Sequence, residues 1–258
     1  MEKYNWLWRS IYAAGLIALA IQQLFYGDFR PVILPPGHDW HGIRLIFTWI
    51  LSVLLTAAGA GIILGIKGRS VSAVLGALLL LIVIIFQIPY ALTNTPQHFF
   101  IWVNPLKELA FSGGAFVVAG TFRREGTNSA IIAFFERLIP YGRFALAILL
   151  VLFGWSHFLY ADFAAGLVPN WIPGHLFWTY FAGIALIAGG LGIMIRSRLA
   201  ALLTGIMLFS WFIVLHIPRA VASLPADYGN EWSSVYEAFA YSGIAFILAG
   251  RRLTEKRA

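Results

Sequence analysis

The chain has 258 residues, of which 60% are hydrophobic and only 11% are charged, and its mean hydropathy is +0.81. Soluble domains usually carry about 25% charged residues, so this composition excludes an ordinary soluble enzyme and a disordered protein. The chain has no cysteine, which excludes disulfides, iron–sulfur clusters held by thiolates and cysteine zinc sites.

Long segments without Asp, Glu, Lys or Arg follow one another along the chain. A run of about 18 or more apolar residues indicates a membrane helix, because backbone polar groups in lipid must bond within the helix. The predicted helices cover residues 6–26, 44–66, 71–91, 105–122, 143–162, 175–195, 199–219 and 234–250. The sequence therefore predicts an all-α, polytopic membrane protein with eight transmembrane helices.

The basic residues predict the orientation of these helices. All but four of the 18 Lys and Arg residues fall on one side, the exceptions being Arg30, Arg44, Lys107 and Arg219. Cytoplasmic loops retain Lys and Arg, so we expect a bacterial inner (cytoplasmic) membrane protein with both termini in the cytoplasm. The basic residues form short clusters between helices and no single patch, which argues against a nucleic-acid partner. The expected partner is the lipid bilayer.

The same series of short motifs occurs twice in the chain. The matching pairs are QLFYGDF (23–29) with HFLYADF (157–163), Pro36-Gly37-His38 with Pro173-Gly174-His175, QIPYA (87–91) with HIPRA (216–220), and SGGAFVVAG (112–120) with SGIAFILAG (242–250). An even number of helices in each half gives a parallel repeat. We therefore predict a tandem 4+4 repeat with a first module over 1–122, a cytoplasmic linker over 123–142 and a second module over 143–258. The linker includes a short amphipathic stretch at 130–139.

Glycine and alanine gather in the second and fourth predicted helices of each half. Small residues allow helix backbones to approach closely, so these clusters predict tight helix packing. They are AAGAG (57–61), SGG (112–114), AGGLG (188–192) and SGI (242–244).

The second half contains HFLYADFAAGLVPNWIPGH (157–175), a following Trp and Gly-rich helix, HIPRA (216–220) and a last helix with Ser-Gly. These motifs resemble the DoxX-like family of four-helix membrane proteins, and the whole chain resembles two such modules fused. A named member of that family is a membrane subunit of a thiosulfate:quinone oxidoreductase. The resemblance implies a redox-linked membrane protein with a quinone as ligand, and leaves open whether the chain is itself an enzyme.

The candidate site residues are polar side chains near the outer ends of the helices. Polar groups within a membrane usually face the interior of the bundle, so we expect them to gather there. The second-half set is His157, His216 and Glu237, with Tyr160 at its rim and Arg219 able to pair with Asp227, Glu237 or a lipid phosphate. The first-half set is Gln23, Gln87, Glu108 and Tyr26.

Several interpretations of these residues stay open. They could be polar contacts that hold the helices together. They could bind a quinone or a lipid head group in the outer leaflet, with His157 or His216 donating to a carbonyl and Glu237 exchanging the proton. A metal site or a bis-histidine haem is less favoured, because the three side chains come from three helices and the first half lacks both histidines. The alternative functions are a small-solute transporter and a non-catalytic scaffold that docks an extracytoplasmic or redox protein partner.

Overall fold

The computed structural model describes residues 2–37, 42–124, 126 and 129–250, and within these ranges every regular element is helical. The all-α prediction is confirmed. His38, in the first predicted Pro-Gly-His turn, lies outside the described residues. The α-helices are α1 (Asn5–Tyr26), α2 (Ile43–Leu64), α3 (Gly68–Ile82), α4 (Ile88–Thr93), α5 (Val103–Ala119), α6 (Ala130–Glu136), α7 (Gly142–Leu159), α8 (Ala161–Ala165), α9 (His175–Met194), α10 (Arg198–Trp211), α11 (Ile217–Ala222) and α12 (Asn230–Gly250).

Five helical stretches in the described part of the chain are long and apolar enough to cross a membrane, which is consistent with a multi-pass membrane protein. They are Ile43–Leu64, Gly68–Thr93, Ala130–Leu159, His175–Met194 and Arg198–Ala222. The other predicted spans correspond to α1, α5 and α12. These helices are shorter or carry more polar side chains, and they are largely buried against their neighbours. A helix surrounded by protein does not need an apolar surface on every side.

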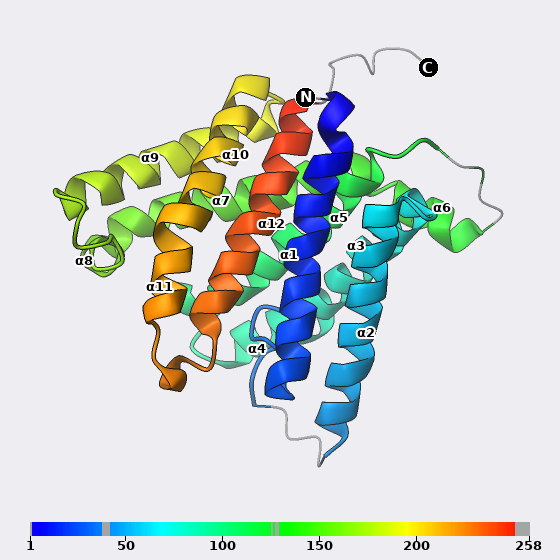
Figure 1. Cartoon of the computed structure of the whole chain (residues 1–258), viewed down its shortest axis with the longest axis horizontal. Coiled ribbons are helices and arrows are strands. Elements are labelled where there is room, and N and C mark those ends of the chain that lie inside the picture. Colours follow the sequence, from blue (N-terminus) through cyan, green and yellow to red (C-terminus); the bar gives the residue numbers. More distant parts are fainter. Residues whose placement is uncertain (1, 38–41, 125, 127–128, 251–258) are drawn as a thin grey trace.

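The helices form two layers of four. Figure 1 shows α10, α12, α1 and α2 side by side in one layer, and their packing follows that order. The second layer runs α3, α5, α7, α9, again with each helix packed on the next. The layers meet where α5 crosses α12 and at the short connections from α2 to α3 and from α9 to α10. Figure 1 shows the start of α1 and the end of α12 at the same end of the molecule.

Each layer takes two helices from each half of the chain. The segments 1–122 and 143–258 therefore share both layers, and helix α1 packs on α12 as extensively as on its own neighbour α2. A single core cluster contains side chains of both halves, including Tyr12, Phe111, Leu146 and Ile244.

Matched glycines make matching contacts between the halves. A Cβ on Gly113 of α5 would lie 2.3 Å from Ala145 Cβ and 2.5 Å from the Gly142 carbonyl of α7. A Cβ on Gly243 of α12 would lie 2.7 Å from the Trp8 carbonyl of α1. These approaches are too close for any side chain. They confirm the tight packing predicted for the small-residue clusters.

One π-helical segment interrupts the helices in each half of the chain, at matched places. Segment η2 (Val83–Gln87) lies between α3 and α4, and η5 (Phe212–His216) lies between α10 and α11. Pro89 and Pro218 follow each segment by two residues. A proline lacks an N–H and its ring clashes with the carbonyl four residues earlier, so the preceding turn widens. The candidate residues Gln87 and His216 each end a π segment.

The linker contains the short helix α6, as the amphipathic stretch at 130–139 suggests. The Ser129 hydroxyl accepts a hydrogen bond from the Ile132 amide at the helix start. An ion pair from Arg69 Nε to Glu136 Oε2, 2.9 Å long, and the ring of Phe135 hold α6 against α3.

Candidate functional site

A buried ion pair joins the two halves where α5 and α12 meet. Lys107 Nζ lies 2.7 Å from Glu237 Oε2, and the two side chains are 17% and 5% exposed. Counted back from the Ser-Gly motifs, Lys107 and Glu237 occupy the same position of the repeat. The repeat therefore places opposite charges at equivalent positions of its two halves.

Two tyrosines bond to the backbone of α5 around this pair. Tyr241 donates its hydroxyl to the Lys107 carbonyl at 2.8 Å, and Tyr12 donates to the Phe111 carbonyl at 2.8 Å. Because one tyrosine comes from α12 and the other from α1, both halves fix the position of α5.

In the first half, residues 29–34 fold back among the helices, and we call them the inserted segment. Phe29, Val32, Ile33 and Leu34 are all buried. Gln87 Nε2 donates to the carbonyls of Pro31 at 2.9 Å and Val32 at 3.3 Å. The first-half candidate Gln87 is thus satisfied by the chain's own backbone.

Gln23 also forms a hydrogen bond with the inserted segment. Its Oε1 accepts from the Arg30 amide at 3.2 Å, while its Nε2 donates to Ser52 of α2 at 3.0 Å. Gln23 is fully buried, and its contacts indicate a structural role.

Arg30 anchors the inserted segment to the second half. It is 4% exposed, and it donates from Nε to Ser233 Oγ at 3.1 Å and from Nη2 to Asn230 Oδ1 at 2.8 Å. Desolvation lowers the pKa of its guanidinium, and nearby Tyr26, Asp227, Asp28 and Glu237 oppose that shift. The group stays charged, because an arginine is not deprotonated in proteins.

The matching segment of the second half, residues 163–168, does not fold inward. Phe163 is 59% exposed, whereas its counterpart Phe29 is 6% exposed. Gly27 ends α1 with φ +64°, and this left-handed turn directs the chain inward. Ala161 stands at the matched position, and a residue with a Cβ rarely adopts that turn. The chain instead forms α8, which packs against α9 and α7.

His216 therefore lacks the partner that its counterpart Gln87 has. Its Nδ1 is buried without a hydrogen-bond partner among the described residues. The π segment that ends at His216 packs against α12, and the charges of Lys107 and Arg219 act on its ring. Buried polar atoms usually have a hydrogen-bond partner, so the Nδ1 of His216 is a candidate to bond a group that is not part of this chain.

Three phenylalanines cluster where α10 and the π segment that ends at His216 pack on α12. The ring centroids of Phe212 and Phe239 are 4.7 Å apart, and Phe209 is 5.7 Å from Phe212. All three side chains are partly exposed. The matched first-half residues are Leu80, Val83 and Leu109, so the aromatic surface exists only in the second half.

The structure places His157 apart from this site. Its Nδ1 bonds to the Phe153 carbonyl of its own helix at 2.7 Å, and its Cβ faces Gly183 of α9. Ser52, the residue matched to Gly183, is the partner of Gln23 in the first half. Gly183 offers no side chain to bond, and among the described residues His157 bonds to its own backbone.

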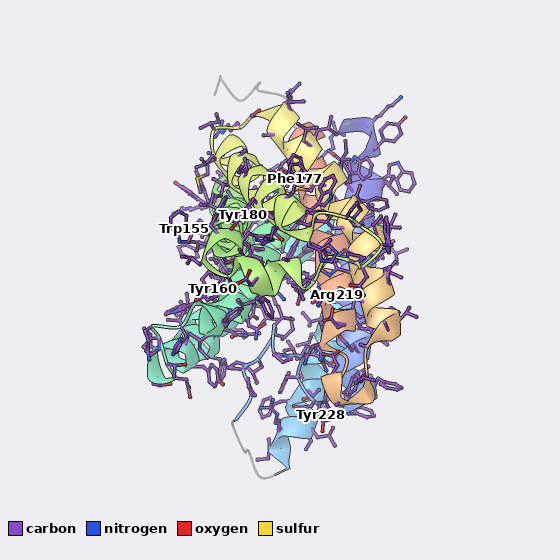
Figure 2. All side chains as sticks on the ribbon, turned by 90° about the vertical axis from the view of Figure 1, so that its left-hand side faces the viewer. Trp155, Tyr160, Phe177, Tyr180, Arg219 and Tyr228 are labelled. Carbon is purple, nitrogen blue, oxygen red and sulfur yellow. The ribbon has the colours of Figure 1, made fainter. Side chains whose placement is uncertain are left out.

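Tyr26 and Tyr160 pack on the opposite half of the chain. The Tyr26 ring lies 5.0 Å from the Arg30 guanidinium, and its hydroxyl approaches Gly229 at the start of α12. The Tyr160 ring lies 4.7 Å from Phe100 in the segment before α5. Figure 2 shows Tyr160 and Arg219 at a similar height on the face formed by the second half.

Arg219 pairs with Glu231, which the sequence did not suggest. The expected partner Asp227 instead accepts a hydrogen bond from the Glu231 amide at 2.8 Å, and Glu237 pairs with Lys107. Asp227 and Glu231 belong to the same turn at the start of α12, so Arg219 reaches the acid that faces α11.

The structure does not form the predicted His157–Glu237–His216 cluster. Within the described residues, no hydrogen bond or ion pair links His157 to the other two side chains, because α7 packs on α5 and α9 while α12 lies beyond α5. In the same part of the chain, no three His, Asp or Glu side chains converge as a metal ion would require.

Two important residues were not among the candidates. Lys107 and Arg30 are basic residues on the side of the helices that has few of them. A buried charge on the side depleted in Lys and Arg is the signal that could have identified both.

These observations define the class of protein: an all-helical chain with several apolar helices of membrane-spanning length and polar groups buried between its halves. A family described as "Domain of unknown function (DUF8561)" matches residues 146–240, which extend from α7 to the middle of α12. The match thus covers most of the second half and includes His216. Comparisons with curated proteins and with solved structures found no match.

Proposed function

We propose that this chain is an eight-span inner-membrane protein built from two DoxX-like four-helix modules, and that it binds a quinone in the outer leaflet as part of a redox system. The quinone site is His216 with the aromatic surface of Phe209, Phe212 and Phe239. The resemblance of the second half to DoxX-like proteins favours a quinone over other hydrophobic ligands. A redox protein on the outer face is the partner that such a subunit requires.

The eight-span arrangement is supported by the matched contacts of the two halves. The glycine approaches, the π segments and the Lys107–Glu237 pair all relate α1, α2, α3 and α5 to α7, α9, α10 and α12. Basic residues also lie together at one end: Arg9 and Arg69 both contact Phe122, and Arg143 lies near Arg196. That end faces the cytoplasm by the positive-inside rule.

Cysteine labelling tests this orientation, because the chain has no natural cysteine. The variants are Gly126→Cys in the linker and Asn170→Cys between α8 and α9, both at exposed positions. On intact cells, a membrane-impermeant maleimide is expected to label Asn170→Cys and to label Gly126→Cys only after permeabilisation. The opposite pattern would show that the helices are inverted, and equal labelling would contradict the proposed number of spans.

The Nδ1 of His216, which has no hydrogen-bond partner among the described residues, is the observation on which the quinone proposal depends. In the first half, Gln87 donates to backbone carbonyls of the inserted segment. In the second half, the matching segment lies outside, so a ligand carbonyl can take the place of those backbone carbonyls. A quinone offers such a carbonyl on a flat ring, and partly exposed phenylalanines suit that ring.

The ligand test compares two histidine variants of the full chain, His216→Leu and His157→Leu. A lost hydrogen bond costs about 0.5–1.5 kcal/mol, so His216→Leu should weaken quinone binding by up to about tenfold. His157→Leu should leave binding unchanged, because His157 bonds to its own helix. Quinone is extracted from protein purified in mild detergent and measured by mass spectrometry, and affinity is measured by adding quinone back.

Folded wild-type protein that never contains or binds quinone would contradict the proposal. Equal losses in both variants would show that the ligand does not depend on His216. Either result would favour the transporter or scaffold alternatives.

A further inference from the structure

Glu108 is a second buried glutamate on α5, and its surroundings differ from those of Glu237. It directly follows Lys107, but Lys107 reaches α12 while Glu108 lies beside Gln87 of η2. Its side chain is 0% exposed, and neither carboxyl oxygen has a hydrogen-bond partner among the described residues. Ala238 occupies the matched position, so the second half has no equivalent group.

The amino group of Gln87 is already used by the backbone of the inserted segment. Both N–H bonds of Gln87 Nε2 point to the carbonyls of Pro31 and Val32. Carbonyl oxygens pair only with the nitrogen of an amide, so these contacts determine which way the amide faces. A Glu108 carboxylate would have to share this amino group with the two backbone carbonyls.

The nearest cation does not change this balance. The ammonium group of Lys107 pairs with Glu237, and Tyr241, which is near enough to interact with Glu108, is neutral. A buried carboxylate with no counter-charge and no donor is strongly disfavoured relative to the neutral acid.

We propose that Glu108 is a proton-binding site: its carboxyl group holds a proton in the folded protein. Glu237, only a few residues away in the fold, is ionised because Lys107 pairs with it. The inserted segment covers this region by bonding to Gln87. The carboxyl group of Glu108 therefore exchanges its proton with water only when residues 29–34 move away. This inference does not rest on the quinone proposal.

Infrared spectroscopy of the full-length protein in lipid at neutral pH tests this inference. The wild type should show the C=O stretching band of a protonated carboxylic acid, which is absent for ionised side chains. Glu108→Gln should remove that band. The double variant Lys107→Met/Glu237→Gln should retain it, because it removes Glu237 without leaving an unpaired ammonium group beside Glu108. Loosening the inserted segment with Val32→Gly should speed the deuterium-induced shift of the band by at least tenfold.

A second acidic variant covers the case in which Glu108→Gln does not fold. Glu108→Asp keeps an acid in place, so its band should change frequency and persist. The proposal is overturned if wild type and Glu108→Gln have the same C=O bands, or if the double variant Lys107→Met/Glu237→Gln loses the band.

Discussion

Removing either member of the Lys107–Glu237 pair should destabilise the protein by about 3–5 kcal/mol, because the remaining charge is left buried without its partner. The variants Lys107→Met and Glu237→Gln test each side. The pair lies where α5 meets α12, so the loss should loosen the contact between the layers. The measurement is the free energy of unfolding, from denaturant titration in detergent micelles.

The double variant Lys107→Met/Glu237→Gln should cost less than either single change, because it leaves no unpaired charge. Asp28→Asn is the matched control. It breaks the Arg44–Asp28 pair, whose acid is 56% exposed, and exposed pairs contribute about 1 kcal/mol or less. Additive single effects, or singles as stable as the wild type, would show that the pair does not hold α5 to α12.

Alanine at Gly113 or Gly243 should destabilise the protein by about 1–3 kcal/mol, since an added methyl group would overpack a helix contact. Gly113→Ala should be the more severe, because its Cβ meets both a methyl group and a backbone carbonyl within 2.5 Å. Gly243→Ala brings a Cβ 2.7 Å from a carbonyl of α1. Thermal and denaturant unfolding of the purified variants measure both effects.

Gly61→Ala is the control for helix propensity. Its Cβ would find its nearest neighbour at 3.6 Å, and alanine favours a helix over glycine by about 0.5–1 kcal/mol. This variant should be as stable as the wild type or more stable. If Gly113→Ala behaved like Gly61→Ala, the close approach of α5 and α7 would be wrong.

The positions of the helices were predictable because their signals are local. The predicted span 199–219 and the observed stretch Arg198–Ala222 differ by a few residues, and the short helix of the linker was also anticipated. The small-residue clusters likewise predicted close contacts. The partners of those contacts were not predictable, because they depend on how α5 meets α7 and how α12 meets α1.

The polar site was only partly predictable. The sequence indicated that polar side chains gather near the outer helix ends. His216 is one of them, and its Nδ1 has no hydrogen-bond partner among the described residues. It also suggested that His157 would join Glu237, whereas the layer order puts α5 between their helices. The ion pair of Arg219 with Glu231 was also unpredictable from the sequence. It depends on the turn at the start of α12, which presents Glu231 to α11.

The sequence by itself determined the helical class, the apolar character and the repeated motifs, because composition and periodicity act within each segment. Only the tertiary structure decided that residues 29–34 pack among the helices of the first half and bond to Gln87. The matching residues 163–168 do not fold inward beside His216. The physical reason lies in one position: Gly27 turns the chain inward through a left-handed conformation, and Ala161 disfavours the same turn. The consequence for Gln87 and His216 arises only when the segment meets residues far away in the chain.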